Sequence, residues 1–129
     1  MVREARLKFT RELSATLTIR SVGVEGICVN GRFWSETIAL TPEEYIDSWQ
    51  SVPLTDLTED NFSALLKHGP ELVIVGTGAK NAFPPRELMF AFARLGVGLE
   101  LMDTAAAART FNVLAGEGRR VAAVLYPLL

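Results

Sequence analysis

The densest run of polar side chains that could act together lies between Asp103 and Arg120. Arg109 and Asn112 are three positions apart, so on a helix they share one face. An arginine binds carboxylate or phosphate groups through several N–H donors, and a nearby carboxylate can move a proton. The segment therefore offers either a docking surface for a protein or a site for a small anion. Its candidate residues are Asp103, Arg109, Thr110, Asn112, Glu117 and Arg119.

A second candidate site is Gly76-Thr77-Gly78, which follows a short apolar run. Glycines after a buried strand let backbone N–H groups approach an anion, and α/β proteins bind ligands at such places. The third glycine of the dinucleotide-binding pattern is missing, and so is the spacing of a Walker A loop. We therefore expect either a tight turn that needs glycine or a site for a small anion, and no bound cofactor.

The residue types that common catalytic mechanisms need are scarce. His68 is the only histidine and Cys28 the only cysteine, so the chain lacks the side chains for a histidine-based triad or a closed zinc site. We expect His68 to lie at a helix end, and Cys28 to be a reduced, buried strand residue. The sequence thus predicts no catalytic residue and no metal site, and it leaves open whether the protein is an enzyme.

Composition limits the class of protein. The 129 residues are 49% apolar and 22% charged, with a net charge of −2, which predicts one domain over residues 1–129 with residues 1–14 as an N-terminal arm. The basic footprint of a nucleic-acid binder is missing, and no apolar run approaches the roughly 20 residues of a membrane-spanning helix. We expect a cytoplasmic protein, or one of the mitochondrial matrix if the source is eukaryotic, without membrane insertion.

Charge is unevenly distributed along the chain. Residues 1–20 carry five basic and two acidic side chains, whereas residues 35–60 carry seven acidic side chains and no lysine or arginine. A solvated face with a loop accounts for the acidic segment. The alternative is a docking surface for a basic partner.

Strand patterns dominate the first third of the chain. Residues 16–20 alternate polar and apolar side chains, which is typical of a half-buried strand. Asn30-Gly31, between apolar residues 27–29 and residues 32–34, predicts a hairpin with a type I′ turn. We expect its second strand to continue through residues 36–40.

The remainder predicts alternating helices and strands. Residues 41–55 are expected to form a loop with one helical turn at 43–49. Thr58 is expected to cap a helix that ends at Gly69-Pro70. Strands are expected at 72–75, 97–102 and 120–126, and helices at 86–95 and from the Asp103 or Thr104 cap to 115.

Two helices that join three apolar strands require a mostly parallel sheet with right-handed crossovers. The predicted fold class is therefore α/β, a single compact domain. Its central sheet is mixed and mostly parallel with flanking helices, and an antiparallel hairpin precedes it.

Several stretches of the second half resemble the Mth-type domain family. The most specific part is Arg109-Thr110-Phe111-Asn112 followed by Glu117-Gly118-Arg119, and residues 75–78 and 96–104 also contribute. The resemblance covers residues 15–126. The family includes small uncharacterised bacterial and archaeal proteins and the mitochondrial complex I assembly factor three.

The resemblance implies a compact α/β domain without an established enzymatic activity. By analogy it implies an interaction or accessory protein that assists assembly of a membrane or respiratory complex and binds a protein subunit, with the oligomeric state left open. The alternative is a small-molecule or anion site near residues 76–78 and Arg109, where Asp103 or Glu117 would handle a proton.

Overall fold

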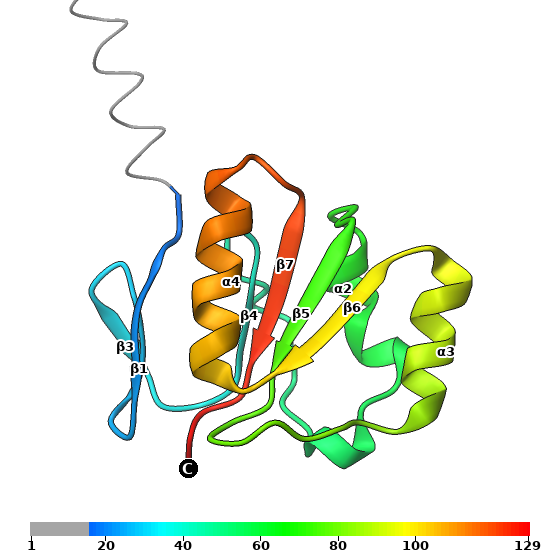
Figure 1. Cartoon of the computed structure of the whole chain (residues 1–129), viewed down its shortest axis with the longest axis horizontal. Coiled ribbons are helices and arrows are strands. Elements are labelled where there is room, and N and C mark those ends of the chain that lie inside the picture. Colours follow the sequence, from blue (N-terminus) through cyan, green and yellow to red (C-terminus); the bar gives the residue numbers. More distant parts are fainter. Residues whose placement is uncertain (1–15) are drawn as a thin grey trace, which may run out of the picture.

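Strands and helices alternate along the chain, and one long helix separates two β-sheets (Figure 1). The structure is a computed structural model that describes residues 16–129, so the predicted arm at residues 1–14 lies outside the described residues. The elements are β1 (Ile19–Gly23), β2 (Gly26–Val29), β3 (Arg32–Trp34), β4 (Ile38–Leu40), η1 (Leu54–Asp56), η2 (Glu59–Phe62), α2 (Ser63–Leu66), β5 (Leu72–Gly76), α3 (Arg86–Leu95), β6 (Gly98–Met102), α4 (Thr104–Gly116) and β7 (Val121–Leu125). The layers are a three-stranded sheet, α4, a four-stranded sheet, and finally α2 with α3. No helix within residues 16–129 has the length and apolar character needed to cross a membrane.

The predicted hairpin forms the centre of the three-stranded sheet, in which β2 pairs antiparallel with β1 and β3. Asn30 and Gly31 have φ values of 49° and 87°, the positive values that a type I′ turn requires. The Asn30 side chain accepts a hydrogen bond from Thr18 N–H (2.8 Å) and donates one to the Thr16 carbonyl (3.0 Å). The hairpin prediction is confirmed. The strand expected at residues 16–20 begins later, as β1, because this side chain takes the hydrogen bonds of the earlier residues.

The three apolar runs of the second half form parallel strands, as predicted. β5 lies between β6 and β7 and pairs parallel with both. β4 completes the sheet antiparallel to β7, which gives the order β4-β7-β5-β6. The expectation that residues 36–40 continue the hairpin is wrong, because the chain leaves the first sheet after Trp34 and enters the second at Ile38. All three β4 residues are buried, as in a strand covered on both faces.

An apolar core lies on each face of the four-stranded sheet. Successive side chains of β5 enter opposite cores, in keeping with the period of two along a strand. Ile74 packs with α4 and the three-stranded sheet, whereas Val73 and Val75 pack with α2 and α3. The sheet is therefore buried on both sides, and the α/β class predicted from the sequence is confirmed.

The helix predicted after Thr58 is shorter than expected. Thr58 forms a capping box with Asn61, whose Oδ1 accepts the Thr58 N–H at 2.8 Å. Ser63 Oγ donates to the Asp60 carbonyl at 3.0 Å, and such local bonds compete with the α-helical pattern. The segment is therefore a 3₁₀ turn, η2, followed by the single turn of α2. Residues 43–49 form no helix: Tyr45 forms a β-bridge with Leu40, and a single turn follows in which Trp49 N–H donates to the Ile46 carbonyl at 3.1 Å.

Helix α4 packs so close to β5 that residue 76 has no room for a side chain. A Cβ on Gly76 would lie 2.9 Å from the Cα of Thr104 and 3.1 Å from the Cβ of Ala107. Contacts under 3.0 Å to backbone require the helix or the strand to shift. Gly76 thus sets the separation between α4 and the sheet.

We expect Gly76→Ala to lower the free energy of unfolding by about 2 kcal/mol, because the added methyl overpacks the contact between β5 and α4. The matched control is Gly116→Ala at the end of α4, where an added Cβ would have nothing within 4 Å. Since alanine favours helix over glycine, this control should be neutral or stabilising by up to about 1 kcal/mol. Urea unfolding of both variants is the measurement, and equal destabilisation would contradict the close-packing argument.

Candidate functional site

The Gly76-Thr77-Gly78 sequence forms a tight turn at the carboxyl end of β5. Thr77 N–H donates to the Met102 carbonyl (2.9 Å), and Gly78 N–H donates to Thr104 Oγ1 (2.8 Å). Gly78 has a φ of 104°, which a residue with a side chain rarely adopts. The two N–H donors that would hold an anion are thus engaged within the protein, and the glycine is explained by the turn.

Thr104 joins three segments of the chain. Its side chain is fully buried, and its Oγ1 accepts the Gly78 N–H at 2.8 Å while donating to the Tyr126 carbonyl at 2.6 Å. Its own N–H donates to the Gly78 carbonyl at 2.9 Å. One hydroxyl therefore connects the turn after β5, the start of α4 and the segment after β7.

The sequence left open whether Asp103 or Thr104 caps α4, and the structure assigns this role to Asp103. Asp103 Oδ1 accepts the Ala106 N–H at 2.9 Å, a normal N-cap interaction. The linking role of Thr104 was missed. The signal available in the sequence was the position of Thr104, directly after the capping Asp103 and before a run of alanines. A hydroxyl buried at such a position needs hydrogen-bond partners.

Asn112 attaches α4 to the three-stranded sheet. Its Nδ2 donates to the Ile19 carbonyl at 2.8 Å, and its Oδ1 accepts the Ile19 N–H at 3.0 Å. The side-chain amide thus pairs with the β1 backbone as a neighbouring strand would. Thr110, also in the predicted set, makes a weak contact in which its Oγ1 donates to Met102 Sδ at 3.5 Å.

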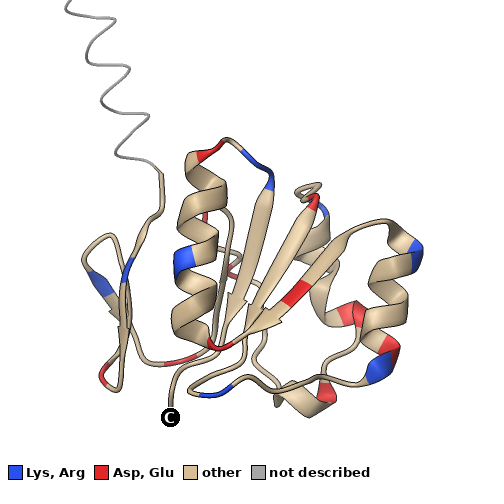
Figure 2. Cartoon of the chain, in the orientation of Figure 1, with Lys and Arg blue, Asp and Glu red and all other residues tan. Residues whose placement is uncertain are grey.

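Arg109 is the single charged residue within α4 (Figure 2). Its side chain is exposed and makes no hydrogen bond or ion pair with residues 16–129. Val113, one turn further along, is 58% exposed. Residues 105, 109, 113 and 117 are spaced four apart and so form one stripe along the helix. We call this stripe the α4 surface; it consists of Ala105, Arg109, Val113 and Glu117.

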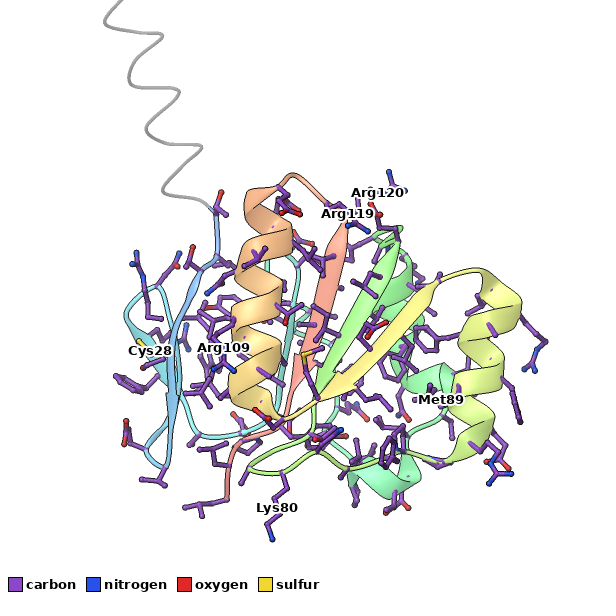
Figure 3. The ribbon with its side chains drawn as sticks, viewed as in Figure 1. Cys28, Lys80, Met89, Arg109, Arg119 and Arg120 are labelled. Carbon is purple, nitrogen blue, oxygen red and sulfur yellow. The ribbon has the colours of Figure 1, made fainter. Side chains whose placement is uncertain are left out.

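Arg119 lies beyond the carboxyl end of α4, away from Arg109 (Figure 3). It pairs with Glu71, with Nη2 and Nε at 2.8 Å and 2.9 Å from Oε1. The hydrogen bond from Arg119, followed by the one from the Arg120 backbone N–H, lowers the pKa of the Glu71 carboxyl. Glu71 and Arg119 are both exposed at this surface, so the pair contributes little to stability.

The predicted site residues therefore do not converge on one ligand. Asp103 and Glu117 flank a 13-residue helix, which at 1.5 Å per residue places them about 20 Å apart. Gly76, Thr77 and Gly78 lie at the Asp103 end, and Arg119 lies at the Glu117 end. No group of three or more histidine, cysteine, aspartate or glutamate side chains suited to a metal occurs in the described part of the chain.

Sequence reasoning also missed a hollow between β3 and the segment that follows β4. It has a volume of about 180 Å³, and its lining includes Trp34, Tyr45 and Trp49. The indole Nε1 atoms of Trp34 and Trp49 are buried and have no hydrogen-bond partner among residues 16–129. Such donors cost roughly 1–3 kcal/mol each when left unpaired. The signal available in the sequence was a pair of tryptophans, with Trp34 directly before the acidic segment 35–60 and Trp49 within it.

The fold with these two sheets around α4 is shared with solved structures. A Xanthomonas campestris protein studied by NMR is 35% identical, with a TM-score of 0.80 over 88% of this chain and 86% of that chain. A Bordetella pertussis protein described as a Mth938-like domain is 30% identical, with a TM-score of 0.73 over 89% of this chain and 87% of that chain. The structure therefore defines a Mth938-like α/β domain, and the resemblance seen in the sequence is confirmed.

Residues 19–126 match the family described as protein of unknown function DUF498/DUF598, and the chain belongs to this family. The chain is also 34% identical over 119 residues to the human protein named NADH dehydrogenase [ubiquinone] 1 alpha subcomplex assembly factor 3. This similarity covers 91% of the chain and 64% of the human protein. The chain thus spans somewhat less than two thirds of that relative's length.

We expect Thr104→Val to lower the free energy of unfolding by about 2–4 kcal/mol, because it leaves the buried Gly78 N–H and Tyr126 carbonyl without their partner. Thr104→Ser is the matched control, since it keeps the hydroxyl and should cost only about 1 kcal/mol for the lost methyl. Chemical denaturation of both variants is the measurement. If the valine and serine variants lost similar free energies of unfolding, the methyl group of Thr104, and not its hydroxyl, would be the stabilising group.

Tyr126 predicts a loss of stability at high pH. Its hydroxyl donates to the Val52 carbonyl at 2.8 Å, and burial followed by the charge of Asp56 raises the pKa of Tyr126 to about 12. An unfolded tyrosine ionises near pH ~10, so the contribution is complete below that pH and is lost as pH rises toward 12. Tyr126→Phe should make the urea midpoint less dependent on pH in this range. If the urea midpoints of the variant and the wild type changed equally with pH, this prediction would be wrong.

Proposed function

We propose that this protein is a non-enzymatic accessory factor that binds a protein partner during assembly of a membrane-bound or respiratory complex. The observation that carries the proposal is the similarity, over 91% of the chain, to a protein named as an assembly factor for NADH dehydrogenase. In this role the protein would act in the cytoplasm, or in the mitochondrial matrix if the source is eukaryotic.

The hydrogen bonding of the candidate residues supports a surface role. The turn donors at Thr77 and Gly78, and the amide of Asn112, are used within the fold. The α4 surface instead presents an arginine without an ion-pair partner in the described residues, beside an exposed valine. Arginine is enriched at protein interfaces and among the few residues that together contribute most of the binding energy. We therefore assign partner binding to the α4 surface.

The anion-site alternative predicts a pocket that joins residues 76–78 with Arg109. The turn amides are already occupied, and no observation favours such a site. A ligand there would have to displace Thr104 Oγ1 from Gly78, which would break the link to Tyr126 as well. The protein-binding proposal needs no such rearrangement.

Capture of the tagged full-length protein from detergent-solubilised membranes tests the proposal. We expect enrichment of subunits of NADH dehydrogenase or another respiratory complex, and a loss of at least tenfold with Arg109→Glu. Arg94→Glu is the matched control, because Arg94 is also an exposed helix arginine, in the last turn of α3. Thermal unfolding should show both variants folded. No stoichiometric respiratory partner, or equal capture by Arg109→Glu, would overturn the assignment.

A further inference from the structure

The hollow beside β3 combines aromatic walls with acidic side chains. Trp34, Tyr45 and Trp49 line it together with Glu36 and Asp47. The first two rings pack against each other with centroids 4.9 Å apart, so packing within the protein holds this wall in place. Trp49 packs against Phe62 in a T-shaped arrangement, with centroids 5.2 Å apart. The aromatic walls are therefore formed before any ligand arrives.

Charge at the hollow favours a cation. Glu36 and Asp47 are exposed, and neither pairs with a basic side chain among residues 16–129. They belong to the segment 35–60, which has seven acidic residues and no lysine or arginine. An anion would be repelled here, whereas a cation gains from both carboxylates and from the negative faces of the rings.

One protein cation already uses such a face. The Arg32 guanidinium lies 4.2 Å from the centroid of the Trp34 ring. Arg32 is not part of the lining of the hollow. Arg32 and Trp34 share one face of β3, which brings this guanidinium onto the ring, whereas the acidic side of the hollow has no basic group in the described structure.

The two unpaired indole N–H groups lie within the walls of the hollow. The buried Nε1 atoms of Trp34 and Trp49 have no acceptor among residues 16–129. The rings themselves, and not these N–H groups, therefore face an occupant. A volume of about 180 Å³ suits one long side chain, since apolar cavities of ~150 Å³ admit a molecule as large as benzene.

We propose that this hollow binds a lysine or arginine side chain of a partner protein. The rings of Trp34 and Trp49 contact the apolar stem, and Glu36 and Asp47 neutralise the charge. This inference rests on the proposed function in one respect, namely that the occupant belongs to a protein. The hollow would be a second contact area, separate from the α4 surface.

The test is an NMR titration of the ¹⁵N-labelled full chain. Its two indole N–H signals come from Trp34 and Trp49, the only tryptophans. The probes are acetyl-Gly-Gly-Lys-Gly-Gly-amide, its arginine counterpart, and a norleucine version that keeps the stem without the charge. We expect both indole signals to shift with the lysine or arginine peptide, with at least tenfold weaker binding of the norleucine peptide.

Matched acidic variants separate the hollow from general charge attraction. Asp47→Asn should weaken binding of the basic peptides at least fivefold, because Asp47 lines the hollow. Asp60→Asn removes the same charge from an exposed residue of the same acidic segment that is not part of this lining, so it should change binding less than twofold. Equal effects of the two variants would overturn the proposal in favour of non-specific attraction.

Two further outcomes would overturn it. If n-butylamine binds as tightly as the lysine peptide, the hollow recognises small amines and not a protein. If the peptide binds only after Arg3, Arg6, Lys8 and Arg11 are replaced by glutamine, the occupant is the chain's own N-terminal segment. Capture of respiratory subunits through the α4 surface is measured separately, so either proposal can fail while the other stands.

Discussion

The contact between the end of β5 and the start of α4 is the constraint on which the rest of the structure depends. Gly76 allows the helix to approach, and the Thr104 hydroxyl then links the turn after β5 to the segment after β7. Helix α4, fixed in this way against one sheet, offers its other side to the second sheet, where Asn112 pairs with the backbone of β1. Both sheets are therefore positioned through one helix.

This arrangement also uses hydrogen-bond donors at the carboxyl end of β5 within the protein. The carboxyl ends of parallel strands are where α/β proteins usually bind ligands. Here the hydroxyl of Thr104 accepts the Gly78 N–H, so this donor is used within the protein. Within the described structure, Arg109 on the α4 surface has no ion-pair partner, and the two buried indoles beside β3 have no acceptor. These are the two places where we propose contact with another protein.

Features set by neighbouring residues could be predicted from the sequence, and features set by distant ones could not. Asn30-Gly31 determines its turn through local backbone angles, and Gly96 ends α3 with a φ of 71°. The sheet to which β4 belongs depends on pairing with β7, more than 80 positions later, and a three-residue strand carries no pattern that reveals it. Asn112 could be placed on a helix face, but its partner Ile19 is 93 residues away. The hollow exists only once β3 and the acidic segment lie together.

The order of strands has a consequence for synthesis of the chain on the ribosome. β7 is made after the other described strands, yet it lies inside the sheet, between β4 and β5. Until it emerges, β4 lacks the strand that joins it to the rest of the sheet. The newly made chain thus exposes strand edges that invite aggregation throughout its translation. A chain that stopped before Val121 would therefore lack the interior of the sheet and not its margin.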